Sequence, residues 1–203
     1  ASVGLNTDSV AVIIGAMLIS PLMGSSLAIS YGTASNDAYL VKRHAVGFAV
    51  QILMSVATAT VYFLLSPVKE PTEQLLARTN PSFFDVLIAL AGGIAGIVGQ
   101  TRKDKSNNII PGVAIATALM PPLCTCGYAI ANGNLRMLLG AFSLFTINAY
   151  FIYIASDLML VLLRTPRVRA MTFAEWKRLR KKMYRNTLLV LLPILAIAIG
   201  WNR

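Results

Sequence analysis

The sequence predicts an all-α fold, a polytopic bundle of transmembrane helices with about six spans. Of its 203 residues, 56% are hydrophobic and only 13% are charged, whereas soluble proteins average about 45–50% apolar and about 25% charged residues. The mean hydropathy is +0.67. Several apolar runs are also close to the length of about 20 residues that a helix needs to cross a bilayer. These observations exclude a typical soluble enzyme, a disordered chain and a disulfide scaffold.

Six apolar runs are the candidate spans, and each is bounded by glycine, proline, asparagine or charged residues that end helices. The runs cover residues 9–31, 45–66, 82–100, 109–131, 137–163 and 186–201. The last run is the shortest. We divide the chain into a first membrane repeat, residues 1–100, and a second membrane repeat, residues 101–203, with three spans each.

The positive charge lies mainly on one side of this predicted topology. The loops 32–44, 101–108 and 164–185 hold 14 of the 18 Lys and Arg residues. Since positively charged loops stay in the cytoplasm, we expect these three loops to be cytoplasmic in a multi-pass protein of the inner (plasma) membrane. Both ends of the chain then lie outside, and because the chain begins at Ala1 we expect a further helix upstream.

The basic loop 164–185 contains a predicted amphipathic helix over residues 172–185. Thr172 and Glu175 form a capping-box pattern at its start, and one face is rich in Lys and Arg. We expect this helix to lie on the inner leaflet, against anionic lipid head groups. A calmodulin-like or nucleic-acid site is the less favoured alternative, so the net charge of +10 does not point to a nucleic-acid partner.

Two of the predicted spans contain proline near the middle of the bilayer. Pro21 stands in the first span, and Pro121 and Pro122 stand in the fourth. Proline removes a backbone donor, and backbone left unpaired at that depth must face protein or water instead of lipid. We therefore expect helices 1 and 4 to be broken at the midplane; tolerated proline kinks are the alternative.

The two broken segments resemble each other when Pro21 is aligned with Pro122. This alignment gives eight identities between residues 12–32 and 113–133, including Gly32 with Gly133. Because three spans separate the two starts, the second copy enters the membrane from the opposite side. The sequence thus predicts a 3+3 inverted repeat, and broken helices at matching positions of such repeats indicate a transporter site.

The expected substrate site lies between the two breaks. Ser20 and Pro21 form a good N-cap and N1 pair, so a half-helix begins there, and a second one begins after Pro122. Two converging helix N-termini favour an anion or a carboxylate, although unwound carbonyls could equally hold a cation. The predicted binding residues are Ser20, Pro21, Gly24, Ser25, Ser26, Pro121, Pro122, Thr125 and Asn148.

A few other polar residues fall inside predicted spans. Asp85 and Asp157 are possible proton or ion relays, or are solvated near a head group. Gln51 and Asn148 more often form interhelical hydrogen bonds than bind ligands.

The sequence contains none of the common catalytic motifs, and Cys124 and Cys126 have no His, Asp or Glu neighbour. We expect no enzymatic activity, no metal and no cofactor.

Three segments resemble a known family: DSVAVIIGAMLISPLMG (8–24), DVLIALAGGIAG (85–96) and PGVAIATALMPPL (111–123). They are similar to signature segments of a family of uncharacterised hydrophobic-domain membrane proteins of bacteria and archaea, the domain of unknown function 389. The resemblance implies a polytopic inner-membrane protein and brings no established substrate. The chain departs from the expected small apolar residues at positions 124–126.

These observations favour a secondary transporter or permease for a small solute or ion. An ion channel on an oligomer axis and a structural or sensory membrane module are the alternatives. We expect a homo-oligomer, with a dimer favoured.

Overall fold

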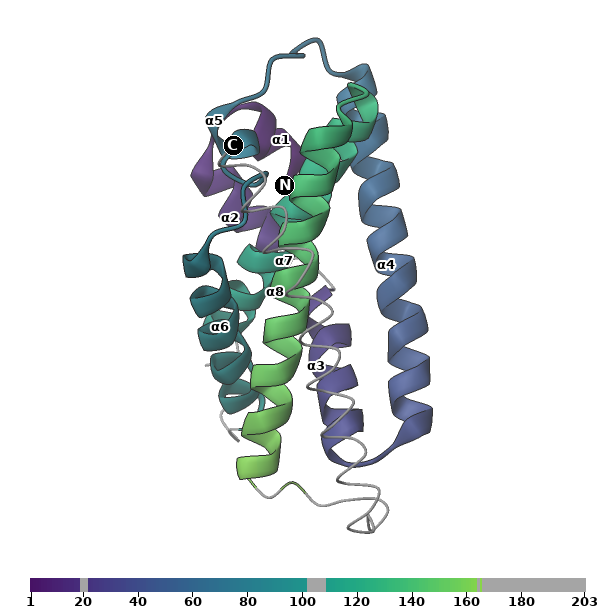
Figure 1. Ribbon diagram of the computed structural model, residues 1–203, viewed down its shortest axis with the longest axis vertical. Helices are drawn as coiled ribbons and strands as arrows, with labels where there is room; N and C mark the ends of the chain where they lie inside the picture. Colours follow the sequence, from purple (N-terminus) through teal and green to yellow (C-terminus); the bar gives the residue numbers. More distant parts are fainter. Residues whose placement is uncertain (19–21, 102–108, 164, 166–203) are drawn as a thin grey trace.

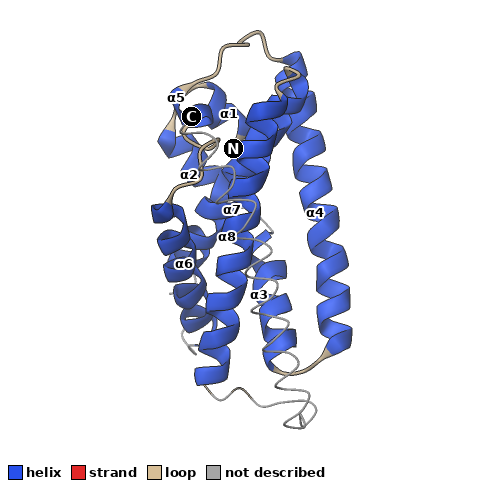
Figure 2. Ribbon diagram, viewed as in Figure 1, coloured by secondary structure: helices blue, strands red, loops and turns tan. Residues whose placement is uncertain are grey.

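The computed structural model describes residues 1–18, 22–101, 109–163 and 165, and every regular element among them is a helix (Figure 2). The described helices are α1 (Ser2–Asn6), α2 (Val10–Leu18), α3 (Leu22–Ala34), α4 (Ala38–Leu65), α5 (Glu73–Leu76), α6 (Phe83–Thr101), α7 (Ile109–Ala131) and α8 (Leu135–Leu162). The predicted all-α class is confirmed.

Three helices, α4, α6 and α8, are long and apolar enough to cross a membrane. The bent pair of α2 and α3 adds a fourth span when it is taken as one. The long helices follow the spans predicted at 45–66, 82–100 and 137–163. The sixth span predicted at 186–201 and the basic helix predicted at 172–185 lie outside the described residues.

The predicted loop 32–44 is mostly helix, which corrects the sequence analysis. The side chain of Asp37 accepts a hydrogen bond from the backbone N–H of Leu40 at 3.0 Å, so α4 begins at Ala38. An aspartate at this position satisfies one of the free N–H groups of a first helical turn. Lys42 and Arg43 therefore stand on the first turns of α4 and extend it beyond its apolar segment.

Helix α7 lies at the centre of the bundle, and α2, α3, α4, α6 and α8 all pack against it (Figure 1). Between Leu119 and Ala129, every residue except Met120 is buried. In contrast, α4 exposes large apolar side chains, such as Leu53 at 69% and Leu65 at 81%. Exposed apolar surface of this extent is expected of a helix that faces lipid.

Successive long helices run in opposite directions through the bundle. In Figure 1, the turn between α3 and α4 and the ends of α6 and α8 lie at the lower end, whereas α1, α5 and the turn between α7 and α8 lie at the upper end. Lys42 and Arg43 therefore belong to the lower end. The predicted basic loops 101–108 and 164–185 lie, apart from residues 101 and 165, outside the described residues.

The α3–α4 and α7–α8 hairpins have the same local construction. Each turn has three residues, of which the middle one is left-handed, Asn36 with φ 58° and Gly133 with φ 67°. The last one, Asp37 or Asn134, caps the next helix by accepting from the N–H three residues later, at 3.0 and 3.1 Å. The helix that follows has 28 residues in both cases. Each position of the first hairpin thus corresponds to the position 97 residues later.

The backbone hydrogen bonds of the two turns match in this same register. In the first turn, the N–H groups of Ser35, Asn36 and Asp37 donate to the carbonyls of Tyr31, Thr33 and Gly32. In the second turn, the N–H groups of Asn132, Gly133 and Asn134 donate to the carbonyls of Tyr128, Ile130 and Ala129. The hairpin geometry therefore pairs Gly32 with Ala129, whereas the proline-based sequence alignment pairs it with Gly133. The two registers differ by four residues, or about 6 Å of helix.

The two predicted helix breaks have different outcomes. The axes of α2 and α3 differ by 47°, and the residues between them, 19–21, lie outside the described residues. Helix α7, however, runs without interruption from Ile109 to Ala131 with Pro121 and Pro122 inside it. The predicted break of the fourth span and the half-helix after Pro122 are therefore wrong.

A side chain of another helix replaces the hydrogen bond that Pro122 removes from α7. Pro122 has no N–H, so the carbonyl of Ala118, four residues earlier, loses its usual partner. The amide Nδ2 of Asn148 on α8 donates to that carbonyl at 2.9 Å. Proline is tolerated in a membrane helix when neighbouring helices satisfy the freed backbone groups.

Candidate functional site

The predicted binding residues that the structure describes lie on α3, α7 and α8. Ser25 and Ser26 stand in the first turns of α3 and are 8% and 5% exposed. Gly24 precedes them and has open space beside its Cα. Ser20 and Pro21 lie outside the described residues.

The predicted residues on α7 lie in its buried middle. Pro121, Pro122 and Thr125 are all buried, and the hydroxyl of Thr125 donates to the carbonyl of Pro121 at 3.0 Å. Leucines of α3 and α7 belong to one apolar cluster, which includes Leu22, Leu27, Leu119 and Leu123 together with residues of α6 and α8. Since α7 has no N-terminus at Pro122, one of the two helix ends that favoured an anion is absent.

The side chain of Asn148 makes one hydrogen bond and keeps one acceptor without a partner. Asn148 is 4% exposed, and its Nδ2 donates a hydrogen bond to the carbonyl of Ala118. Its Oδ1 is buried without a hydrogen-bond partner. Because a backbone carbonyl can only accept, the nitrogen must face Ala118 and the oxygen must face away.

The two predicted relay residues are not brought together. Asp85 stands in the first turn of α6 and accepts from the N–H and the hydroxyl of Ser82 at 2.7 and 2.8 Å, so it caps this helix. Asp157 is 6% exposed near the end of α8, and its Oδ1 has no partner. Asp157 follows Asn148 by nine residues, or two and a half turns, so the side chains of Asp157 and Asn148 lie on opposite faces of α8.

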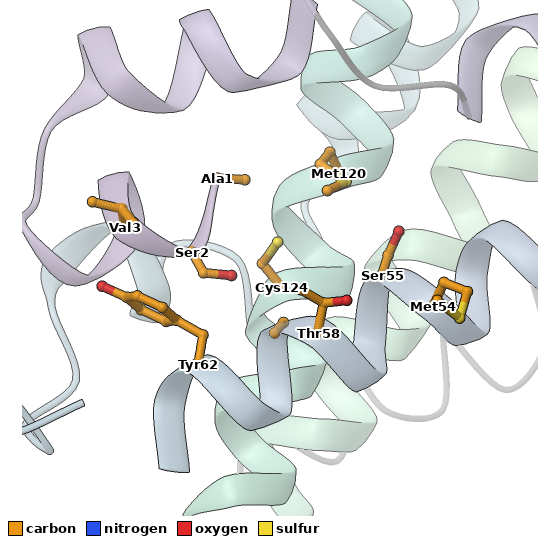
Figure 3. Close-up of a pocket in the computed structure, with 10 residues that line it drawn as sticks. Ala1, Ser2, Val3, Met54, Ser55, Thr58, Tyr62, Met120 and Cys124 are labelled. Atoms are coloured by element: carbon orange, nitrogen blue, oxygen red, sulfur yellow. The ribbon is translucent and has the colours of Figure 1, made fainter. Parts of the chain in front are cut away.

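A pocket of about 410 Å³ opens between α1, α4 and α7 (Figure 3). Its polar lining comes from Ser2 of α1, Ser55, Thr58 and Tyr62 of α4, and Cys124 of α7. None of the predicted binding residues that the structure describes lines it. Among the described residues, no group of three His, Cys, Asp or Glu side chains could hold a metal ion.

The polar pocket residues of α4 continue a stripe along one face of this helix. Phe48, Gln51, Ser55, Thr58 and Tyr62 follow one another at spacings of three or four residues, which places them on one face. Gln51 lies one turn beyond the pocket residue Ser55, and Phe48 lies one turn beyond Gln51. We missed this stripe in the sequence, although its spacing inside an apolar span was the available signal.

Phe48 and Phe145 meet between α4 and α8, with ring centroids 6.3 Å apart and planes inclined by 22°. These two residues correspond to each other in the 97-residue register of the hairpins. The same register pairs Gln51 with Asn148. Like Oδ1 of Asn148, Oε1 of Gln51 is buried and has no hydrogen-bond partner. The stacked phenylalanines are thus accompanied by two equivalent carboxamides, each with a free acceptor.

The all-helical fold and its long apolar helices are those expected of a helical membrane protein. Residues 17–154 match the family described as a domain of unknown function (DUF389). The chain belongs to this family, which confirms the resemblance found in its motifs.

An uncharacterised protein of the archaeon Methanocaldococcus jannaschii is 30% identical over 145 residues, or 71% of this chain. The chain spans about 45% of the length of that curated relative. No solved structure is significantly similar to the chain.

Proposed function

We propose that this chain is the membrane part of a secondary transporter for a small solute or ion, built as an inverted repeat with its site between α4 and α8. The observation that carries the proposal is the contact of Phe48 with Phe145, two equivalent positions of the two hairpins. Equivalent residues of a repeat touch each other only where the axis that relates the two copies passes between them.

Helix packing supports this arrangement. The contact between α3 and α4 corresponds to the contact between α7 and α8. The contact between α4 and α7 likewise corresponds to the contact between α8 and α3. Because α4 and α8 run in opposite directions (Figure 1), an axis that relates them lies in the membrane plane. Inverted repeats of this kind place the transport site near the bilayer midplane at the repeat interface.

The two halves differ in accessibility, as one access state of a transporter requires. Ser55 and Thr58 of α4 line the open pocket, and they are half-buried and exposed respectively. Their counterparts on α8, Ile152 and Ala155, are 0% and 3% exposed. Helix α6 covers these counterparts, since a Cβ at Gly93 of α6 would lie 2.7 Å from the carbonyl oxygen of Ile152 and 2.9 Å from Cβ of Ala155. One half is therefore open where the other is sealed.

Labelling of single cysteines tests the proposal in oriented membrane vesicles. In a background with Cys124→Ala and Cys126→Ala, Thr58→Cys lies in the pocket and Ala155→Cys lies at the counterpart position on α8. A membrane-impermeant maleimide should reach Thr58→Cys from the α1 end only and Ala155→Cys from the opposite end only. A transported solute should slow one reaction and speed the other.

Glu70→Cys, on the exposed connection between α4 and α5, provides the control for vesicle orientation. A channel would allow both test positions to react from either side at once. Complete protection of Ala155→Cys under every solute condition would instead favour a packed structural module. Either result would overturn the transporter proposal.

A further inference from the structure

Two buried amide oxygens without partners belong to residues that stand three positions after the stacked phenylalanines on the same two helices. Asn148 is 4% exposed, and its Nδ2 is already occupied by the carbonyl of Ala118. Neither its Oδ1 nor the Oε1 of Gln51 has a partner. A buried carbonyl without a donor costs several kcal/mol in a transfer to an apolar medium, so both oxygens call for a ligand that donates hydrogen bonds or carries positive charge.

The two oxygens stand on opposite sides of the aromatic pair. Gln51 follows Phe48 by three residues and Asn148 follows Phe145 by three residues, which is about 4.5 Å along each helix. Since α4 and α8 run in opposite directions, the two steps point opposite ways and separate the amides by about 9 Å along the membrane normal. Gln51 lies on the side of the pocket and Asn148 on the other side.

The charges of the core favour a cation. No Lys or Arg is among the buried residues that the structure describes. None of the residues that line the pocket is a carboxylate, so a singly charged cation fits this set of neutral oxygens better than a divalent one, which is usually bound by carboxylates. Amide carbonyls and hydroxyls, such as those of Ser55 and Thr58 in the pocket above Gln51, are the oxygen ligands that hard cations prefer. An anion would meet the negative ends of both amides.

We infer that Gln51 and Asn148 are two successive binding positions for a small monovalent cation, with the Phe48–Phe145 pair as the barrier between them. The cation enters through the pocket, contacts Gln51, and reaches Asn148 when the aromatic pair separates. This inference rests on the proposed transporter function and names its ion. No covalent step is involved.

Thermal unfolding of the full purified chain tests the cation site. Cys126 is free, buried and outside the pocket lining, so in a Cys124→Ala background a thiol-reactive fluorophore reports unfolding. Sodium chloride is compared with lithium, potassium and N-methyl-D-glucamine chlorides at one ionic strength. At ten times its Kd, Na⁺ should raise Tm by about 3–5 °C relative to N-methyl-D-glucamine.

Variants locate the effect. Gln51→Met keeps the length of the side chain and removes the free acceptor, so it should lower the affinity for Na⁺ by about tenfold or more. Asn148→Gln keeps an amide oxygen and a donor for the carbonyl of Ala118 and should retain the response, whereas Asn148→Leu should lose it. Thr146→Val, on the same helix and with its hydroxyl bonded to its own backbone at 2.8 Å, is the matched control and should respond like the wild type.

The outcomes separate this inference from the proposed function. An absent Na⁺ response in the wild type, or an undiminished response in Gln51→Met, overturns the cation site. If cysteine labelling still alternates in that case, the transporter proposal survives and only its ion is wrong. A Tm increase with small anions and with no cation also overturns the inference.

Discussion

Replacement of Gly127 by alanine should force α4 and α7 apart. A Cβ at position 127 would lie 2.5 Å from Cβ of Ala59 and 2.8 Å from the backbone nitrogen of Thr60. Neither atom can rotate away, because one is fixed to the backbone and the other belongs to it. Small residues at such contacts let membrane helices approach closely.

The cost follows from the distance by which the helices must separate. Carbon atoms in contact lie about 3.5–4.0 Å apart, so the new methyl group requires a shift of about 1 Å. Overpacking of this kind costs about 1–3 kcal/mol, and the better helix propensity of alanine returns about 0.5–1 kcal/mol. We therefore expect Gly127→Ala to lower the free energy of unfolding by up to about 2.5 kcal/mol, or Tm by up to about 10 °C.

Gly47→Ala is the matched control, since a Cβ at position 47 of α4 would have nothing within 4 Å. It should leave Tm unchanged or raise it slightly. Both variants are measured by thermal unfolding in the same detergent with the thiol-reactive fluorophore. If Gly127→Ala unfolds at or above the temperature of Gly47→Ala, the close approach of α4 and α7 is refuted.

Three further predictions concern other contacts. Pro122→Ala supplies the N–H that the carbonyl of Ala118 lacks. Asn148→Leu should therefore destabilise the Pro122→Ala variant by about 1 kcal/mol less than it destabilises the wild type. Equal destabilisation of both in a double-mutant cycle would contradict the idea that Asn148 replaces this N–H. Gly133→Ala should lower the free energy of unfolding by about 1 kcal/mol, because position 133 has a φ of 67°. Gly133→Asn should cost clearly less in the same unfolding assay, since asparagine stands at the equivalent position of the other turn. Similar losses of stability for the two variants would argue against the left-handed turn. Asp85→Ala removes the two hydrogen bonds that Asp85 accepts from Ser82 at the start of α6 and should cost about 1 kcal/mol. The cysteine-labelling pattern should not change; altered alternation with unchanged stability would instead indicate a relay.

The sequence alone was sufficient for the class of the protein and the course of its long helices. Apolar runs of membrane-spanning length and the polar residues between them are local properties, so the predicted spans 82–100 and 137–163 closely match α6 and α8. The family could also be identified from three short motifs, because these consist of residues contiguous in the chain.

The continuity of α7 depended on a contact between distant residues. Whether Pro121 and Pro122 end a helix is decided by the availability of a donor for the freed carbonyl, and that donor is Asn148 on another helix. The sequence around the prolines contains no information about this partner. The anion preference therefore rested on a helix end that tertiary packing removes.

The register between the two hairpins was likewise decided by the tertiary structure. Apolar strings align in more than one way, and the prolines favoured a shift of 101 residues, whereas the turn dihedrals, caps and hydrogen bonds agree on 97. Only the second register pairs Phe48 with Phe145 and Gln51 with Asn148. The sequence determined which side chains were available, and the packing of antiparallel helices decided which of them meet, because a contact between α4 and α8 depends on backbone geometry far from either residue.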